Sequence, residues 1–265
     1  IIFSFLEHMR TFKDRDHFVW LTFMEVHHLL NMIPDISNQV ANGISAHSVT
    51  PWYDPDNKAK SVFISRDSNL SEIYVNEIKR LDYYLKLIYA FVEESFKENE
   101  VLVTLVSDHG HAFLTSDQHP LAIPRTKVPW MIRGGDIPQQ TSYEFTENVD
   151  VFEALIKCCD LTVEEHISDS QLPVALGGDT EREFAFSQSI YPGQTYKAVI
   201  RDRYFEYRFE SRTLVQPNGN IQCEIDLKET SCSDEKDTTP LPHEIEKYRA
   251  MIIDKIEEWN NNLRK

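Results

Sequence analysis

A long amphipathic pattern, followed at once by a continuous apolar run, limits the architecture of this chain more than any other segment. Between residues 70 and 97, apolar side chains recur at alternating steps of four and three, starting at Tyr74. This spacing predicts a helix with a single apolar face. The residues Val101–Val106 that follow are all apolar or β-branched. Such a run predicts a strand that is buried on both faces, as in a parallel sheet.

Two other segments have a similar character, and together they predict the fold class. Phe18–Met24 and Val128–Ile132 are short apolar runs, and a further helix is predicted over residues 148–158. Strands separated by a long helix imply crossover connections between parallel strands. We therefore expect an α/β fold with a mostly parallel sheet and flanking helices. Residues 35–68 have few apolar side chains and no clear period, so they predict a long surface loop.

The pattern changes near residue 180. Residues 195–209 and 213–227 alternate between apolar and polar side chains, and the second stretch contains Asn218-Gly219, which is a strong hairpin signal. A last helix is predicted from Pro242 to Leu263. These elements predict a small antiparallel sheet packed with a terminal helix. We therefore expect two domains, residues 1–175 and 176–265, with a soft boundary within 165–185.

The charge of the chain excludes one class of partner. Asp and Glu number 43 against 27 Lys and Arg, which gives a formal net charge of −16. Nucleic acid is a poor partner for such a chain, because binding a polyanion needs a basic surface. An anionic small substrate would need local positive charge. No apolar run approaches the roughly 20 residues of a membrane-spanning helix, so no membrane span is expected.

The four cysteines are too few for a disulfide scaffold, and they form no array with histidines that would suggest a zinc site. Cys223 and Cys232 are candidates for a disulfide across a loop. Such a bond would favour a secreted, periplasmic or lumenal protein. Cys158 and Cys159 fall in a predicted helix and are interpreted as small core residues.

Polar residues follow the predicted strands. His27 and His28 come after the first strand, and Asp108-His109-Gly110 comes after the second. Ligands bind outside the carboxyl ends of strands in open α/β sheets, so we expect one shared site. A carboxylate beside an imidazole suits a divalent metal, and Gly110 permits the turn that lets both converge. The alternatives are a purely polar strand end and structural histidines.

Other histidines and several basic residues lie near this motif. His111 and His119 are close enough in the sequence to add a ligand or a catalytic group. Arg125, Lys127 and Arg133 offer contacts to an anion. Each of these side chains has an ordinary structural or surface role as its alternative.

The order of these elements resembles the C-terminal half of the sulfatase family, within the alkaline phosphatase superfamily. The most specific element is Ser107-Asp108-His109-Gly110 after a buried strand. The other matching segments are patterns rather than strict motifs: residues 77–82 in the long helix, 127–134, 148–155 and 196–204. The resemblance covers most of residues 15–265 and is firmest from 74 to 156.

The resemblance implies a metal-assisted hydrolysis. In that family a nucleophile attacks a sulfate or phosphate centre held against a divalent cation, which neutralises the anion and lowers the pKa of the nucleophile. Asp108 and His109 match the family's second pair of metal ligands, and Ca²⁺ is the ion implied. His27 matches a histidine that contacts the transferred group. His119 is a candidate match for a histidine beyond Asp-His-Gly, although the gap is longer than usual and His111 competes for it.

The leading interpretation is a hydrolase of sulfate esters. In it His27 and His119 are catalytic, and His28, Arg125 and Lys127 bind the anionic substrate. One alternative is a phosphodiesterase, phosphonate hydrolase or phosphoglycerol-type transferase of the same superfamily, which would favour Mn²⁺ or Zn²⁺ and recruit a further histidine. A second alternative is a binding module that has lost catalysis.

Two features of the family are missing from the 265 residues. The Cys/Ser-x-Pro-x-Arg motif that carries the nucleophile does not occur, and neither does the acidic pair of metal ligands on the family's first strand. We expect an upstream N-terminal half of the same protein to supply both, because the sequence starts at Ile1 without Met or a signal peptide. This chain by itself is therefore expected to be inactive.

Overall fold

A computed structural model describes residues 2–23, 68–110, 117, 119–135, 137–163, 169–232 and 239–263. The chain divides into two compact units. The first unit comprises Ile1–Val103 with His111–Gln118, and the second comprises Thr104–Gly110 with His119–Lys265. The boundary predicted between residues 175 and 176 remains a prediction about domain organisation.

The first unit contains two helices that pack against each other, α1 (Ile2–Thr11) and α3 (Ser68–Ser95), and a short 3-10 helix, η1 (Glu98–Glu100). The helix predicted over residues 70–97 is confirmed. Phe91 of α3 is buried and meets Phe5 of α1 edge-on, with the ring centroids 6.1 Å apart. The guanidinium of Arg10, also on α1, lies over the Phe91 ring, 5.7 Å from its centroid. Aromatic contact therefore joins the two helices.

The strand predicted over Phe18–Met24 is not present in the described part of that segment. Residues 18–23 are irregular, and Phe18 and Trp20 are 78% and 72% exposed. An apolar run becomes a strand only where a neighbouring strand pairs with its backbone N–H and C=O groups. Among the described residues, none pairs as a strand with residues 18–23.

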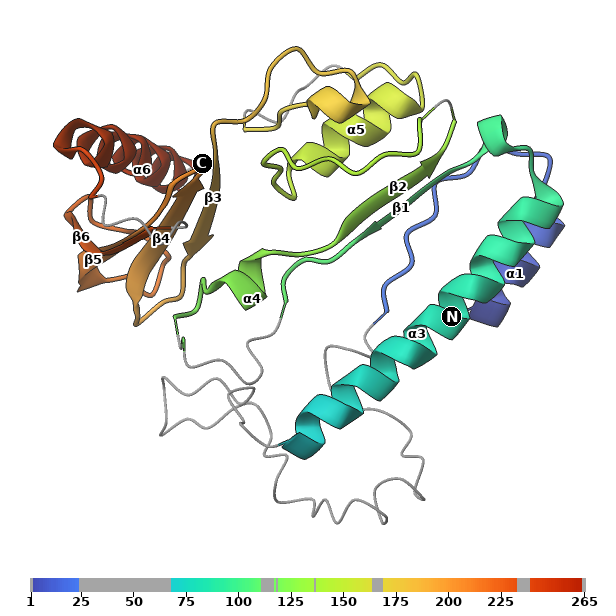
Figure 1. The fold of residues 1–265 in the computed structure, drawn as a ribbon, viewed down its shortest axis with the longest axis horizontal. Helices are drawn as coiled ribbons and strands as arrows, with labels where there is room; N and C mark the ends of the chain where they lie inside the picture. Colours follow the sequence, from blue (N-terminus) through green and yellow to red (C-terminus); the bar gives the residue numbers. More distant parts are fainter. Residues whose placement is uncertain are drawn as a thin grey trace. The chain divides into compact units, whose positions relative to one another are not determined.

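Two strands form a small sheet, β1 (Leu102–Val106) and β2 (Trp130–Gly134), with α4 (Ile123–Thr126) between them in the sequence (Figure 1). Both strands were predicted, and both are confirmed. Thr104 Oγ1 donates to the Met131 carbonyl at 3.3 Å, and beyond the strand ends Gly110 N donates to the Arg125 carbonyl at 2.7 Å. The partner's number falls as the first segment advances, so the two segments run antiparallel.

The mostly parallel sheet expected from the sequence is therefore not what the described residues form, because both of their sheets are antiparallel. The physical reason is that a continuous apolar run indicates burial and carries no information on the direction of the neighbouring strand. The burial is also partial, since every residue of β1 is half-buried and β2 alternates between half-buried and exposed positions.

The helix predicted over residues 148–158 is confirmed as α5 (Asp150–Cys158), and a short 3-10 helix, η2 (Val174–Leu176), follows it. Its buried residues are Asp150 and Ala154, whereas Phe152 is 36% exposed. A buried carboxylate at the first turn thus orients this helix, and apolar spacing alone does not reveal it.

The C-terminal part of the second unit is a four-stranded antiparallel sheet. Its strands follow one another in sequence order: β3 (Phe184–Ser189), β4 (Thr195–Asp202), β5 (Phe205–Leu214) and β6 (Ile225–Cys232). The helix α6 (Pro242–Asn262) packs on it (Figure 1). Gly219, in the predicted turn between β5 and β6, has a φ angle of 84°, a conformation that glycine adopts without strain. The predicted small antiparallel sheet with a terminal helix is therefore confirmed.

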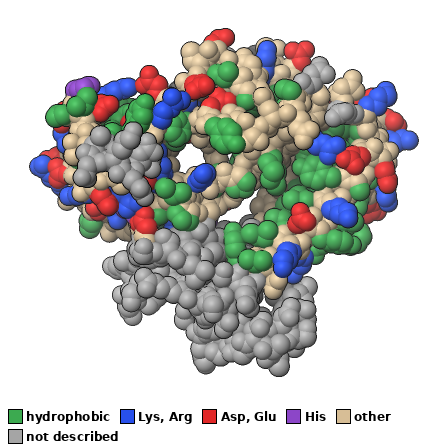
Figure 2. Space-filling model, in the orientation of Figure 1, with side chains coloured by type: hydrophobic (Ala, Val, Ile, Leu, Met, Phe, Trp, Pro, Cys, Tyr) green, Lys and Arg blue, Asp and Glu red, His purple; other side chains and the backbone are tan. Residues whose placement is uncertain are grey.

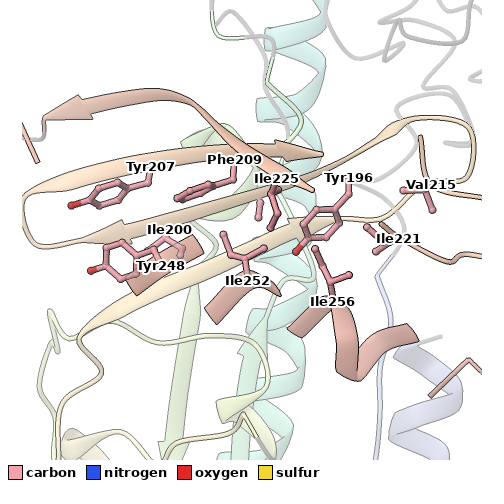
Figure 3. Close-up of a cluster of buried hydrophobic side chains, with 11 residues drawn as sticks. Tyr196, Ile200, Tyr207, Phe209, Val215, Ile221, Ile225, Tyr248, Ile252 and Ile256 are labelled. Atoms are coloured by element: carbon pink, nitrogen blue, oxygen red, sulfur yellow. The ribbon is translucent and has the colours of Figure 1, made fainter. Parts of the chain in front are cut away.

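The core of this C-terminal part lies between α6 and the sheet (Figure 3). Tyr248, Ile252 and Ile256 are four residues apart on α6 and face side chains that alternate along the strands, such as Tyr207 and Phe209. The rings of Tyr207 and Tyr248 have centroids 4.9 Å apart. The apolar side chains of the helical and the alternating patterns thus pack together in a single layer.

None of the four cysteines, all of which lie in described parts of the chain, forms a disulfide. The expected bond between Cys223 and Cys232 is therefore wrong. Cys223 precedes β6 and Cys232 is its last residue, so an extended strand of roughly 25 Å separates them, whereas a disulfide needs Cα atoms within about 7 Å. Cys159 is exposed rather than in the core.

Charged side chains of opposite sign are interspersed on the face shown in Figure 2. Arg212 lies 2.9 Å from Asp226, and Lys247 lies 2.9 Å from Glu183. Water screens exposed pairs of this kind strongly, so they do not determine the fold. Within the described ranges, no helix has both the length and the apolar character needed to cross a membrane.

Candidate functional site

The structure describes most of the predicted site residues. Those described lie in the second unit, and they are Asp108, His109, His119, Arg125, Lys127 and Arg133. The remaining candidates, His27, His28 and His111, lie outside the described residues, as does almost all of the predicted loop 35–68.

Asp108 and His109 form a turn that directly follows β1. Asp108 Oδ1 accepts the backbone N–H of His109 at 2.8 Å, and Asp108 Oδ2 lies 3.6 Å from His109 Nε2. Ser107 Oγ donates to the His109 carbonyl at 2.8 Å, which tightens the turn. The side chain of Asp108 is 80% exposed and that of His109 is 49% exposed. A carboxylate oxygen and an imidazole nitrogen thus lie side by side at an accessible surface.

A hydrogen bond from Nδ1 assigns the tautomer of the His109 ring in its neutral form. Its Nδ1 lies 3.0 Å from the carbonyl oxygen of Gly110. A carbonyl oxygen only accepts hydrogen bonds, so Nδ1 carries the proton, and in the neutral ring Nε2 carries the lone pair. Metal-binding histidines commonly donate their other ring N–H to a backbone carbonyl in this way.

The distance between Asp108 Oδ2 and His109 Nε2 also suits two ligands of one cation. Two ligands at about 2.3–2.6 Å from one Ca²⁺ ion, at right angles, lie about 3.3–3.7 Å apart, a range that includes the 3.6 Å between Asp108 Oδ2 and His109 Nε2. The pair therefore fits two adjacent positions on a divalent cation. Nowhere in the described ranges do three or more His, Cys, Asp or Glu side chains gather in a way that could hold a metal ion.

The backbone of this turn is fixed from two directions. The Asn148 side-chain amide, just before α5, donates to the carbonyls of Ser107 at 3.1 Å and of Asp108 at 3.0 Å. In addition, Gly110 N donates to the Arg125 carbonyl at 2.7 Å. Sequence reasoning missed Asn148, because a lone Asn before a helix indicates only a local turn or cap. Its contacts lie about forty residues away along the chain.

Replacing Gly110 with Ala is expected to distort this turn. A Cβ atom at position 110 would lie 2.2 Å from the backbone carbonyl oxygen of Pro124, so the backbone itself would have to move. We expect Gly110→Ala to lower the free energy of unfolding by about 1–3 kcal/mol, measured by urea denaturation. Gly193→Ala is the control, because no atom lies within 4 Å of its added Cβ and only its φ of 82° is unfavourable. A loss no larger than the control's would contradict the close approach.

His119 lies in the turn that leads into α4. Its Nδ1 accepts the backbone N–H of Leu121 at 3.2 Å, and its carbonyl accepts the N–H of Ala122 at 3.0 Å. Because Nδ1 accepts, the neutral ring carries its proton on Nε2. His119 and His109 are therefore held in opposite tautomers. One presents an N–H at Nε2 and the other a lone pair at Nε2.

The two predicted anion-binding residues differ in their surroundings. Arg125 lies in α4, half-buried, and burial lowers the pKa of its guanidinium; arginine nevertheless stays protonated at neutral pH. Lys127, the residue that ends α4, is exposed. The structure thus ties the Arg125 backbone to the Asp108 turn through Gly110 and leaves Lys127 at the surface.

A buried cluster of charges holds the segment that carries Asn148. The carboxylate of Asp150 is 1% exposed and accepts the backbone N–H of Glu147 at 2.7 Å, the N–H of Gln171 at 2.8 Å, and a bond from Arg182. Glu147 lies 3.3 Å from Arg182, accepts the N–H of Phe186 at 2.9 Å, and has its pKa raised by burial. The cluster joins α5 to the start of β3.

Comparison with known proteins adds one match. A family model described as Sulfatase matches residues 3–161. No curated protein matches the chain. The matched range contains both β1 and α5, together with the Asp108 turn.

Proposed function

Because the chain belongs to the sulfatase family, we propose that it forms the C-terminal portion of a hydrolase of sulfate esters and supplies part of its metal site. Family membership implies an alkaline-phosphatase-like α/β fold and supports hydrolysis of sulfate esters at the level of the family. The observation that carries the proposal is the Asp108–His109 pair, with Nδ1 of His109 on the Gly110 carbonyl.

We assign the binding of a divalent cation to Asp108 and His109, with Ca²⁺ as the ion and Mn²⁺ or Zn²⁺ as the alternatives. When bound, the cation would neutralise an anionic ester and lower the pKa of the attacking group. Asp108 supplies a carboxylate oxygen, and His109 supplies a nitrogen lone pair at Nε2. Asn148 and Gly110 hold the backbone that presents both groups.

The other predicted residues have proposed roles toward the ester. His119 carries a proton at Nε2 when Nδ1 accepts from Leu121, so it is placed in the role of a proton or hydrogen-bond donor to an ester oxygen. His27 is assigned to contact with the transferred group. His28, Arg125 and Lys127 are assigned to binding the anionic substrate, which needs local positive charge in a chain of net charge −16.

The nucleophile is proposed to lie outside this sequence. No Cys/Ser-x-Pro-x-Arg motif occurs in the 265 residues. We propose that an upstream N-terminal half of the same protein supplies that motif together with the remaining acidic ligands, and that the chain by itself does not turn over sulfate esters. The same absence favours a second candidate, a binding module of this family without catalysis.

The test compares substrate classes on the protein expressed from the whole source reading frame. We expect turnover of an aryl sulfate with Ca²⁺, and slower turnover of a phosphodiester and a phosphonate ester of the same phenol. Faster turnover of the phosphorus esters with Mn²⁺ or Zn²⁺ would replace the sulfatase by a phosphorus-ester hydrolase. If the reading frame lacks the nucleophile motif and no ester is turned over, the binding module becomes the favoured function.

A further inference from the structure

Arg201 of β4 contacts the stretch from His119 to Lys127, which carries three of the predicted site residues. Its Nη2 donates to the Leu121 carbonyl at 2.6 Å, and its Nη1 donates to Thr126 Oγ1 at 2.8 Å. These two partners lie at the opposite ends of the segment 121–126, which contains α4. A single planar guanidinium therefore spans the segment, and it comes from a strand eighty residues further along the chain.

The segment that Arg201 holds is in direct contact with two parts of the candidate site. Leu121 donates its backbone N–H to His119 Nδ1 at 3.2 Å, so the residue that Arg201 binds also fixes the His119 ring. At the other end, the Arg125 carbonyl accepts the N–H of Gly110, next to His109. A displacement of the segment would move both the His119 ring and the Asp-His-Gly turn.

Arg201 is itself held in place by a carboxylate. Its Nε donates to Glu206 Oε2 at 2.6 Å, and Arg208 Nε donates to Glu206 Oε1 at 2.6 Å. The Glu206 side chain is 9% exposed, and each arginine side chain is 17% exposed. Charge-assisted hydrogen bonds of this kind are about twice as strong as neutral ones. The guanidinium of Arg201 is thus pre-positioned before any ligand arrives.

We propose that Arg201 is a positioning residue, through which the C-terminal sheet fixes the His119 ring and the Asp108 turn. Its effect on the His119 ring is independent of any reaction. Its consequence for turnover rests on the proposed function. The small C-terminal sheet is then part of the architecture of the site as well as a stable appendage.

The sequence supplies a matched control for this role. Arg208→Gln removes a guanidinium from the same carboxylate but leaves the bonds of Arg201 to Leu121 and Thr126 in place. Arg201→Gln removes those bonds. Both variants delete one charge from the same cluster, so a general loss of stability is common to the two.

The first measurement is the nitrogen–proton correlation spectrum of the histidine rings in the protein expressed from the whole source reading frame, with the His119 signals assigned from a His119→Gln variant. In the wild type we expect the Nε2–H tautomer of His119. In Arg201→Gln we expect the two ring nitrogens to move toward a mixture of tautomers, and in Arg208→Gln we expect the wild-type pattern. Identical His119 signals in all three proteins would overturn the proposal.

The second measurement uses the protein expressed from the whole reading frame and an aryl sulfate. We expect Arg201→Gln to lower kcat by about 10-fold to 100-fold, as a misplaced catalytic group does, with Arg208→Gln near the wild type. Moved His119 signals without any wild-type turnover would leave the positioning role intact and refute the proposed function. Moved signals with unchanged kcat would refute the link from Arg201 to turnover.

Discussion

Asp108→Ala is expected to abolish cation binding and turnover while leaving the fold in place. The carboxylate is one of only two metal ligands proposed in this chain. A bound metal supplies several kcal/mol of transition-state stabilisation. A loss of about 4 kcal/mol corresponds to a rate about 10³-fold lower. The side chain is 80% exposed, so the free energy of unfolding should change by only about 0.5 kcal/mol.

Three measurements check this expectation. Calorimetric titration with Ca²⁺, Mn²⁺ and Zn²⁺ gives the cation affinity, a sulfate-ester assay gives kcat/KM in the protein from the whole reading frame, and urea denaturation gives stability. Asp254→Ala is the control, because Asp254 is an exposed carboxylate on α6. Turnover in Asp108→Ala equal to that of Asp254→Ala would remove Asp108 from the site.

Asp150→Asn is expected to produce the largest loss of stability, about 3–5 kcal/mol, which is typical of breaking a buried ion pair from one side. The carboxylate is almost fully buried and accepts from two backbone N–H groups and from Arg182. An amide keeps the shape but removes the charge, and its NH₂ group has donors as neighbours. The free energy of unfolding, measured by urea denaturation, checks this value.

Glu147→Gln is the matched control in the same cluster. Burial raises the pKa of Glu147, so its surroundings already disfavour the charged form, and the amide oxygen of Gln can still accept the N–H of Phe186. We expect a cost of about 1 kcal/mol, the value of an ordinary hydrogen bond. Equal losses in Asp150→Asn and Glu147→Gln would show that Asp150 is not the main anchor of Arg182.

The elements that the sequence predicted well are those with local signals. The helices α3 and α6 follow from apolar residues spaced at three and four, and the β5–β6 hairpin follows from alternation around Asn218-Gly219. Such patterns are reliable because a spacing of three and four indicates a helix and alternation indicates a strand, without reference to distant residues. The strand predicted at Phe18 failed because its pairing depends on a neighbour that the pattern does not contain.

The residues of the candidate site likewise divide into those with a local sequence signal and those whose partners are distant in the sequence. Asp108 and His109 were found because they follow a predicted strand, and the structure places their side chains 3.6 Å apart. Asn148, Asp150 and Arg201 were not identified as functional, because their partners lie far away in the sequence. A polar side chain of this kind looks like any surface residue until its partner is known.

The sequence by itself determined the main helices, most of the strands, the family resemblance and the pair of residues proposed to bind a cation, because each rests on neighbours within a few turns or a short motif. Only the tertiary structure decided that β1 and β2 run antiparallel, that His109 and His119 hold opposite tautomers, and that Arg201 reaches the turn at Leu121. Strand direction and hydrogen-bond partners depend on which distant segments meet. That choice is made by packing and by the need to pair every buried polar group, and it leaves no local period in the sequence.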